Sequence, residues 1–360
     1  MKALTTPDDE SNKANKTAGS KIYGEIIKRR KLILTVMIVC AVLGFFINIS
    51  LGPMKYTLWE VIRTIIRPDS SPLVMRLIIW DYRMPEAIMA LLVGAALAMA
   101  GAEMQTILDN PLAEPYTLGI SASAAFGAAL AIVLGIGVGS FGSYTTAINA
   151  FLFALLSCTI IYLMMKFKSA DKYTMILTGV ALLFLFQALV SVLQVTSSKE
   201  GAMAVMFWMF GSLGNSNWLM VAIVSVVCLL VGMLFFKNTW KLTSLKLGDS
   251  KASSLGVDVA RLRKKMLLGI SLLTAVAVCF TGVIGFVGLV GPHIARMLVG
   301  EDQRYFLPVS ALSGALFLTV AAIISKSVSL ASVLPIGIVT SLIGVPFFLF
   351  MILGKKKVMA

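Results

Sequence analysis

Residues 32–51 read Leu-Ile-Leu-Thr-Val-Met-Ile-Val-Cys-Ala-Val-Leu-Gly-Phe-Phe-Ile-Asn-Ile-Ser-Leu, a run without a charged residue. About 20 apolar residues cross the hydrocarbon core of a bilayer as a helix, and this run is longer than the core of a signal peptide. The polar residues 1–31 precede it and end in the basic cluster at 28–31. No small-residue cleavage site follows. We therefore expect an uncleaved first membrane helix after a cytoplasmic tail of residues 1–31.

The composition of the whole chain extends this interpretation. Of 360 residues, 58% are hydrophobic and only 13% are charged, and the mean hydropathy is +0.92. A soluble domain is nearer half apolar and a quarter charged. These values exclude a soluble enzyme, a disordered regulator and a secreted disulfide scaffold, and they predict an all-α polytopic membrane protein.

Ten apolar runs are candidate membrane spans, and together they define one transmembrane domain over residues 32–354. The eighth is short for a full crossing. The runs are 32–51, 86–107, 116–136, 145–165, 174–195, 218–236, 266–284, 287–299, 307–325 and 335–353.

The positions of the basic residues test the count of ten. With the N-terminus inside, 24 of the 31 Lys and Arg residues fall on the cytoplasmic side and 7 on the outer side. Basic residues collect on the cytoplasmic side of membrane proteins. The net charge of +14 is thus explained by membrane topology, with no need for a nucleic acid partner. We expect both termini, including the tail at 355–360, in the cytoplasm of a cell that carries this multi-pass protein in its plasma or inner membrane.

Two connections between spans are long enough to fold. The outer segment 52–85 mixes apolar residues with Glu60, Arg63 and Arg67, which is typical of an interfacial amphipathic helix. The inner segment 237–265 contains the stretch Leu245–Arg263, which we interpret as a short helix-turn-helix at the cytoplasmic surface.

Several spans carry small residues at every fourth position, for example Ala90, Gly94, Ala98 and Ala102. Such stripes allow helix backbones to approach closely. General helix packing is enough to explain them, so we do not infer a homodimer seam from them.

The sequence contains no recognisable catalytic or metal-binding constellation. His293 is the only histidine, and the four cysteines lie inside apolar runs, where cysteine behaves as a small hydrophobe. The phosphate-binding pattern G-x-x-x-x-G-K-[ST] is absent from the sequence. We expect no enzyme activity and no metal or cofactor on this chain, so ATP-driven transport would require ATP hydrolysis by another chain.

Three stretches have residue patterns too specific to be explained by contact with lipid alone. They resemble, in order and with suitable spacing, the permease subunits of binding-protein-dependent ABC importers of the FecCD type, and the resemblance runs from about residue 75 to 354. The stretches are Arg83-Met-Pro-Glu86 with 94–101 and Asn-Pro-Leu-Ala-Glu-Pro at 110–115; Thr-Gly-Val-Ile-Gly-Phe-Val-Gly-Leu-Val-Gly-Pro-His-Ile-Ala-Arg at 281–296; and Leu-Pro-Ile-Gly-Ile-Val-Thr at 334–340.

The resemblance implies a ten-helix permease with the type II importer architecture, in agreement with the ten runs. It implies two permease subunits, identical copies or paralogues, around one path. Two cytoplasmic ATPase subunits that use ATP and Mg would drive alternating access, and an external binding protein would deliver a metal chelate. Ferric siderophore is our first expectation for the cargo, with haem and cobalamin as alternatives.

The resemblance also implies roles for inner residues. Ser254, Leu255, Gly256 and Val257 match the family's coupling loop, whose apolar ridge would enter a groove on the ATPase; a solvated basic loop is the alternative. A cytoplasmic gate is implied at the turn after the second span and between the fourth and fifth spans, where an ordinary interhelical turn is the alternative. The gate residues are Asn110, Pro111 and Leu112, and Asp171, Lys172 and Tyr173.

At the outer side, Arg83 and Lys326 match positions where the family carries arginines that meet acidic residues of the binding protein. Charge complementarity would orient that docking; for Arg83 the alternative is a residue that snorkels to the interface. The chain departs from the family pattern at Glu86, Ala322 and Val333. Lysine also lacks the planar fork of arginine, so the docking surface is altered here.

Apart from Glu86 at the first position of its span, Glu103 is the only acid inside an expected span. An intramembrane carboxylate is costly and indicates function by default. A channel or an ATP-independent secondary transporter that uses Glu103 is therefore the alternative to the importer. Its distance from the outer end of the helix favours a solvated or protonated group near the inner mouth over an ion site.

Overall fold

The computed structural model describes residues 7–137, 142–167, 172–328 and 334–354, and within these ranges the chain is helical and has no strand. Seven described helices are long and apolar enough to cross a membrane, and three shorter apolar helices accompany them. Each of the ten expected runs overlaps one of these ten helices, so the all-α fold is confirmed. They are α1 (Pro7–Ser50), α4 (Met84–Leu108), α5 (Ile120–Leu134), α6 (Thr145–Phe167), α7 (Lys172–Thr196), α9 (Trp218–Phe236), α12 (Val259–Thr281), α13 (Val287–Val299), α14 (Gln303–Val328) and α15 (Ile336–Gly354).

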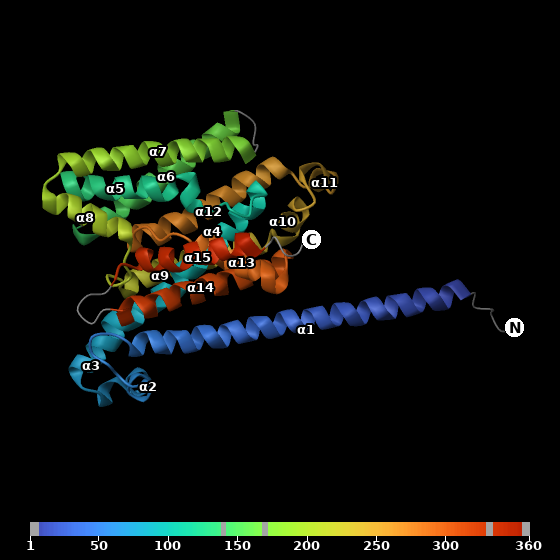
Figure 1. Ribbon diagram of the computed structural model, residues 1–360, viewed down its shortest axis with the longest axis horizontal. Helices are drawn as coiled ribbons and strands as arrows, with labels where there is room; N and C mark the ends of the chain where they lie inside the picture. The colour runs from blue at the N-terminus through green and yellow to red at the C-terminus, as the bar shows by residue number, and fades with distance from the viewer. Residues whose placement is uncertain (1–6, 138–141, 168–171, 329–333, 355–360) are drawn as a thin grey trace.

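Short elements mark the two ends of the bundle (Figure 1). We call the end near both chain termini the inner end, and it carries α10 (Thr239–Leu245) and α11 (Asp249–Ser254). The opposite, outer end carries α2 (Leu58–Ile66), η1 (Pro68–Ser70), α3 (Leu73–Leu77) and α8 (Lys199–Phe210). Within the stretch expected to form a helix-turn-helix, Leu245–Arg263, the structure has α11 and the start of α12, while α10 ends at Leu245.

The first helix, α1, is continuous from Pro7 to Ser50 and so includes most of residues 1–31 as well as the first span. That residues 1–31 form a cytoplasmic tail stays a prediction. The inner half of α1 is tied to the bundle by Arg30, which forms an ion pair with Asp302 at 3.1 Å and lies 4.9 Å from the centre of the Tyr305 ring. Hydrogen bonds from Arg304 lower the pKa of Asp302, which keeps this carboxylate ionised.

The outer helix α2 is amphipathic, as the sequence predicts. The Thr57 side chain caps the first turn of α2. The Glu60 carboxylate in turn accepts a hydrogen bond from the backbone N–H of Thr57, and the two contacts form a capping box. Val61 faces the bundle and is fully buried, whereas Trp59 is 72% exposed. That α2 lies in the membrane interface stays a prediction.

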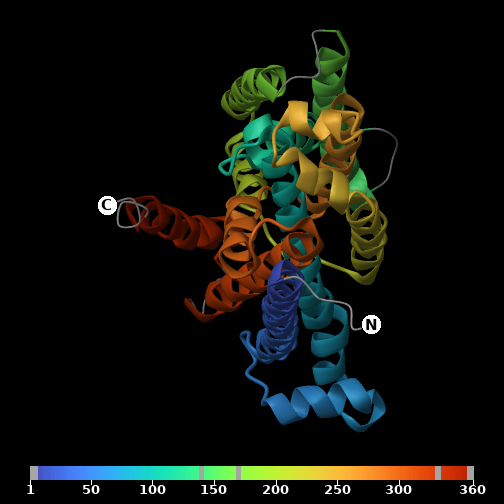
Figure 2. The same ribbon diagram turned by 90° about the vertical axis from the view of Figure 1, so that its right-hand side faces the viewer.

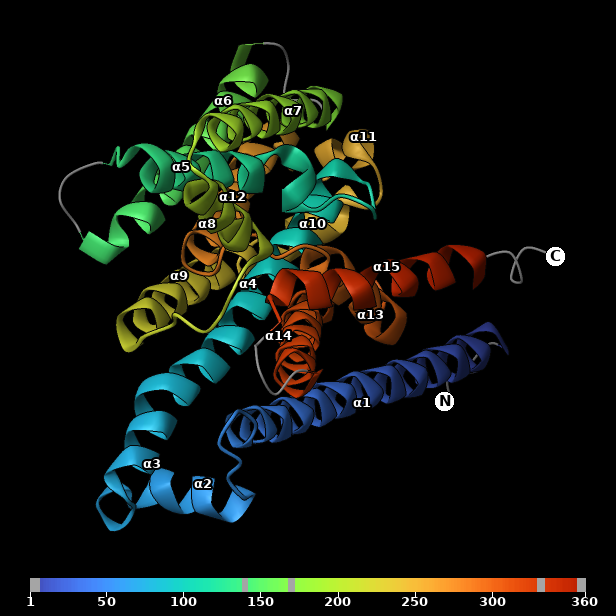
Figure 3. The ribbon, with the colours of Figure 1, turned by 60° about the vertical axis from the view of Figure 1, so that its left-hand side comes forward.

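Helix α4 occupies the centre of the bundle. Of its most apolar stretch 78% is buried inside the chain, compared with 22% for α1 and for α7. It contacts α9, α12, α13 and α14, while α5 to α8 form a second group beside it (Figure 2). Helix α15 packs on α13 and α14 and extends away from the second group (Figure 3).

Glycines allow α4 to contact its neighbours by backbone. A Cβ on Gly94 would collide with the carbonyl of Gly314 on α14, and a Cβ on Gly101 would collide with the carbonyl of Gly288 on α13. The side chain of Ala98 fits between these contacts, against Gly314 and Gly291. The small-residue stripe thus serves packing within the chain, as the sequence analysis expects.

A methyl group at Gly101 tests this close contact. Because backbone atoms of α13 leave no space, we expect Gly101→Ala to lower the free energy of unfolding by about 1–3 kcal/mol or more. The matched control is Gly24→Ala on α1, where a Cβ meets no atom within 4 Å. Thermal melting in detergent measures both. Equal melting temperatures for the two variants would contradict the packing described.

Candidate functional site

The loop that follows α11 presents one apolar side chain and buries another. Leu255 is 50% exposed, whereas Val257 is 4% exposed and belongs to the main hydrophobic core. Gly256 joins them with φ +83°, a left-handed conformation that glycine adopts without strain. The backbone N–H of Val257 bonds the carbonyl of Ala252, which is also buried.

This arrangement corrects part of the sequence interpretation. Val257 does not belong to an exposed apolar ridge, because its side chain is buried in the main hydrophobic core and anchors the loop there. The inner hairpin, residues 239–257, has three large exposed apolar side chains: Trp240 at 62%, Leu247 at 57% and Leu255. Ser254 closes the last turn of α11 by donating its hydroxyl to the carbonyl of Ser250.

Arg263, in the second turn of α12, joins this hairpin to α4. Its side chain is 5% exposed and forms a two-pronged ion pair with Asp249, the first residue of α11, at 2.8 and 2.9 Å. Its Nε donates a third hydrogen bond, of 2.9 Å, to the carbonyl of Ile107 in the last turn of α4. A cation at that position also compensates the negative end of the α4 dipole.

The turn that follows α4 is the first expected gate. Asp109 ends the helix in a left-handed conformation, φ +48°. The side-chain oxygen of Asn110 then accepts a hydrogen bond of 3.0 Å from the backbone N–H of Leu112. Pro111 and Leu112 are exposed.

The second expected gate segment lies beside the first. Lys172, at the start of α7, forms an ion pair of 3.4 Å with Asp109. Tyr173 is 67% exposed, and Asp171 lies outside the described residues. The structure thus brings the two segments together through a contact that the sequence analysis did not identify.

Glu114 lies half-buried in the same turn, where the backbone N–H of Phe286 bonds its carboxylate. Phe286 precedes α13 with φ +67°. Burial raises the pKa of Glu114 from the usual 4.5 to about 7, and the bond from Phe286 opposes this shift. The charge of this inner turn therefore changes near neutral pH.

A pH dependence of stability follows from Glu114. Its raised pKa means that the folded protein holds the proton more tightly than the unfolded chain. The resulting stabilisation is complete below pH 4.5 and is lost as pH rises through about 7. We expect a higher melting temperature in detergent at pH 5 than at pH 8, with a contribution of at most about 3 kcal/mol from this group. Glu114→Gln should reduce the difference, and an undiminished difference in that variant would contradict the assignment.

A polar cluster connects α4, α13 and α14 at the inner end. Arg296 donates to the side-chain oxygen of Gln105 at 3.0 Å and pairs with Glu301 at 2.9 Å. Lys246, between α10 and α11, pairs with the same Glu301 oxygen at 3.4 Å. These contacts join the inner ends of α4, α10 and α13 to the turn that precedes α14.

Glu103 lies two residues before Gln105 on α4, deeper in the bundle, and is fully buried. Neither of its oxygens has a hydrogen-bond partner among the described residues. The interpretation as a solvated group is therefore wrong. An ionised carboxylate would be buried without a hydrogen-bond donor among the described residues, which favours the protonated alternative.

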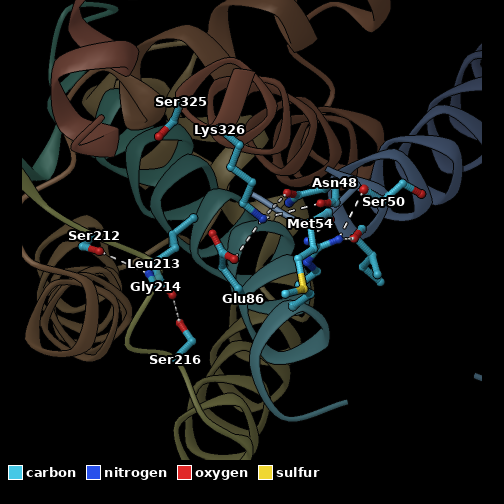
Figure 4. A network of polar contacts seen from close by, with 12 residues as sticks. Asn48, Ser50, Met54, Glu86, Ser212, Leu213, Gly214, Ser216, Ser325 and Lys326 are labelled. Atoms are coloured by element: carbon cyan, nitrogen blue, oxygen red, sulfur yellow. Dashed lines mark hydrogen bonds and ion pairs between the residues drawn. The ribbon is translucent and has the colours of Figure 1, made fainter. Parts of the chain in front are cut away.

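A cavity of about 1230 Å³ opens among the outer ends of the helices. Glu86 and Lys326 lie on one side of it, and residues 211–215 lie on the other (Figure 4). Trp208, Met220 and Pro335 add apolar surface. The volume exceeds the roughly 300–1,000 Å³ of a pocket for a drug-sized ligand.

The two residues expected to dock a binding protein have partners within the chain. Lys326, with a side chain 6% exposed, pairs with Glu86 at 2.9 Å and donates to the side-chain oxygen of Asn48 at 2.8 Å. Arg83 is 6% exposed and donates to the backbone carbonyls of Ile49, Ser50 and Met54. This arrangement excludes an interfacial snorkelling role for Arg83, and docking stays a prediction for both.

The departures from the family pattern explain this arrangement in part. Glu86 supplies the partner of Lys326, and Ala322, one turn before the lysine, is buried. Val333 lies outside the described residues. The outer network therefore joins α4 to α14 by an ion pair and both helices to α1 by hydrogen bonds.

Removing the lysine tests this network. Lys326→Met leaves Glu86 largely buried without its cation, and we expect the free energy of unfolding to fall by about 3–5 kcal/mol. The double variant Glu86→Gln/Lys326→Met should recover part of that loss, because it leaves no uncompensated charge. Thermal melting in detergent measures both, with the exposed Lys199→Met as control. Equal melting of the single and double variants would contradict the pairing.

Comparison with known proteins settles the family. The model of the FecCD transport family matches residues 39–354. The chain belongs to this family. It is 36% identical over 281 residues to the hemin transport system permease protein HmuU of Yersinia pestis, an alignment that covers 78% of this chain and 84% of the relative. It is 31% identical over 327 residues to the iron(3+)-hydroxamate import system permease protein FhuG of Bacillus subtilis, covering 89% and 96%.

A solved structure described as an inward-facing conformation of a metal-chelate type ABC transporter superposes with a TM-score of 0.78. It is 31% identical and covers 90% of this chain and 99% of its own. The FecCD-type chain is therefore an ABC transporter permease, a multi-pass membrane transport component. Its fold is that of the permease subunits.

Proposed function

We propose that this FecCD-type chain is the permease subunit of an ATP-driven importer that moves a metal chelate from an external binding protein to the cytoplasm. The observation that carries the proposal is the inner hairpin. It holds two exposed leucines on a base that is buried and fixed by Arg263. An apolar ridge held rigidly at the inner surface fits docking into a groove of a partner protein.

The partners follow from the same proposal. Two ATPase subunits bind ATP and Mg and engage Ser254, Leu255 and Gly256 at the inner end, while Val257 holds the loop in place. A second permease subunit, identical or paralogous, completes the path. Both termini lie in the cytoplasm, which the excess of basic residues at the inner end supports.

The cytoplasmic gate lies where the two inner segments meet. Asn110, Pro111 and Leu112 form one side, and Lys172 and Tyr173 form the other. The exposed ion pair between Asp109 and Lys172 closes the contact. Because an exposed pair contributes only about 0–1 kcal/mol, it suits a contact that opens in each cycle.

The cargo is a metal chelate, and a ferric siderophore is the first to test, with haem and cobalamin next. The hydroxamate and hemin relatives support this class, and the large outer cavity suits a bulky chelate. The binding protein docks at the outer end. Arg83 and Lys326 take part only if docking breaks their contacts within the chain.

The coupling role has a direct test. Affinity purification of the tagged chain from its native host in mild detergent should recover an ABC ATPase. We expect Leu255→Asp to lose the ATPase, because a charge replaces the exposed apolar contact.

Leu58→Asp is the matched control, since Leu58 has nearly the same exposure, 49%, at the outer end. This variant should retain the ATPase. Recovery of the chain alone, together with ion-driven transport that Glu103→Gln abolishes, would overturn the importer and favour the secondary transporter.

A further inference from the structure

Arg263 bonds directly both to the hairpin that is proposed to face the ATPase and to the end of the helix that precedes the gate, whereas Lys246 reaches α4 only through Glu301 and Arg296. The three donor groups of Arg263 are all used, two on Asp249 of α11 and one on the carbonyl of Ile107 in α4. Two residues later, Asp109 begins the gate turn and pairs with Lys172 of α7. The contacts form a continuous chain from α11 to α7.

The chemistry of Arg263 suits the transmission of a displacement. A guanidinium is planar and always charged, and its fork matches a carboxylate in a fixed geometry. Here Nη1 and Nη2 bond to Asp249 of α11, and Nε–H bonds to the carbonyl of Ile107 in α4. The Arg263 side chain is nearly inaccessible to solvent. A movement of α11 therefore displaces the Arg263 side chain, and the end of α4 must follow or lose a buried hydrogen bond.

Other contacts of α11 do not reach the gate in this way. Ala252 and Val257 pack into the core and anchor the hairpin by apolar contact, which has no direction. Arg261 lies two residues before Arg263 on α12, but its side chain is 86% exposed and pairs locally with Asp258. Arg263 alone among these joins two elements through directed bonds.

We propose that Arg263 is a positioning residue for transport: it sets the position of the inner end of α4, and so of the gate turn, according to the position of α11. The inference rests on the proposed function, because α11 moves only if an ATPase binds it. Removing the contacts of Arg263 with Asp249 and Ile107 should leave the complex with the ATPase assembled, but the gate should no longer respond to nucleotide.

The experiment measures the gate directly in the complex of this chain with its ATPase. Spin labels replace Leu112 and Tyr173, which are exposed on the two sides of the gate. The background is Cys40→Ser, since the other three cysteines are buried. Distance distributions are compared without nucleotide and with ATP plus vanadate. The wild type should show a nucleotide-dependent change in the ratio of two distance populations.

In Arg263→Gln we expect the nucleotide-dependent change in that ratio to fall by about tenfold, within the usual range of coupling between sites. Arg263→Lys keeps the charge without the fork and should be intermediate. Arg261→Gln, the matched control, should respond as the wild type does. Because Arg263→Gln removes a buried group, Asp249→Asn provides a second variant that keeps the bond to Ile107; it should also reduce the response.

The outcomes separate the inference from the proposed function. A wild-type response in both Arg263→Gln and Asp249→Asn, with the ATPase still bound, would overturn the inference and leave the importer intact. Failure to recover an ATPase with the unlabelled chain would overturn the proposed function and the inference with it. An assembled complex in which the labels never respond to nucleotide would overturn the role of this turn as the gate, and so the inference.

Discussion

The backbone contact of α4 with α13 and α14 is the constraint on which the other features of the chain depend. Gly94 and Gly101 place the α4 backbone against carbonyls of both neighbours, so this helix has little freedom to tilt or slide independently. The outer cavity lies beside the first turn of α4, and the expected gate follows its last turn. A rigid central helix of this kind couples its two ends, because a displacement at one end is carried along the helix instead of being absorbed by local repacking.

Charge pairing completes the arrangement at both ends. At the outer end, Glu86 and Lys326 join α4 to α14, and at the inner end Arg263 joins α4 to α11. The cations Lys326 and Arg263 are largely inaccessible, so leaving either without its acceptor is costly, whereas the pair between Asp109 and Lys172 is exposed and weak. The structure therefore combines stable ion pairs at both ends of α4 with a weak ion pair at the expected gate, which can open easily.

The sequence predicted the ten apolar helices, the packing role of the small-residue stripe and the amphipathic outer helix, because each depends on local pattern and length. It did not predict the burial of Val257 or the contact of Asp109 with Lys172. It also did not reveal Arg263, whose partners lie 14 and 156 residues away in the sequence. The same limit applies to Arg83 and Lys326. Their positions in the family pattern suggest charges that are free to meet a partner, but the folded chain provides acceptors for both. Pairings between distant segments arise from the tertiary fold, and a single sequence carries no direct record of them.

The central claim is that ATP hydrolysis by a partner drives transport through this chain. Its most direct test is uptake of a radiolabelled ferric hydroxamate into proteoliposomes that contain the chain with its ATPase, supplied with its binding protein. We predict accumulation against a gradient when the ATPase has ATP and Mg, and none when the nucleotide is absent. Accumulation by the chain alone, driven by an ion gradient without ATP, would contradict the account.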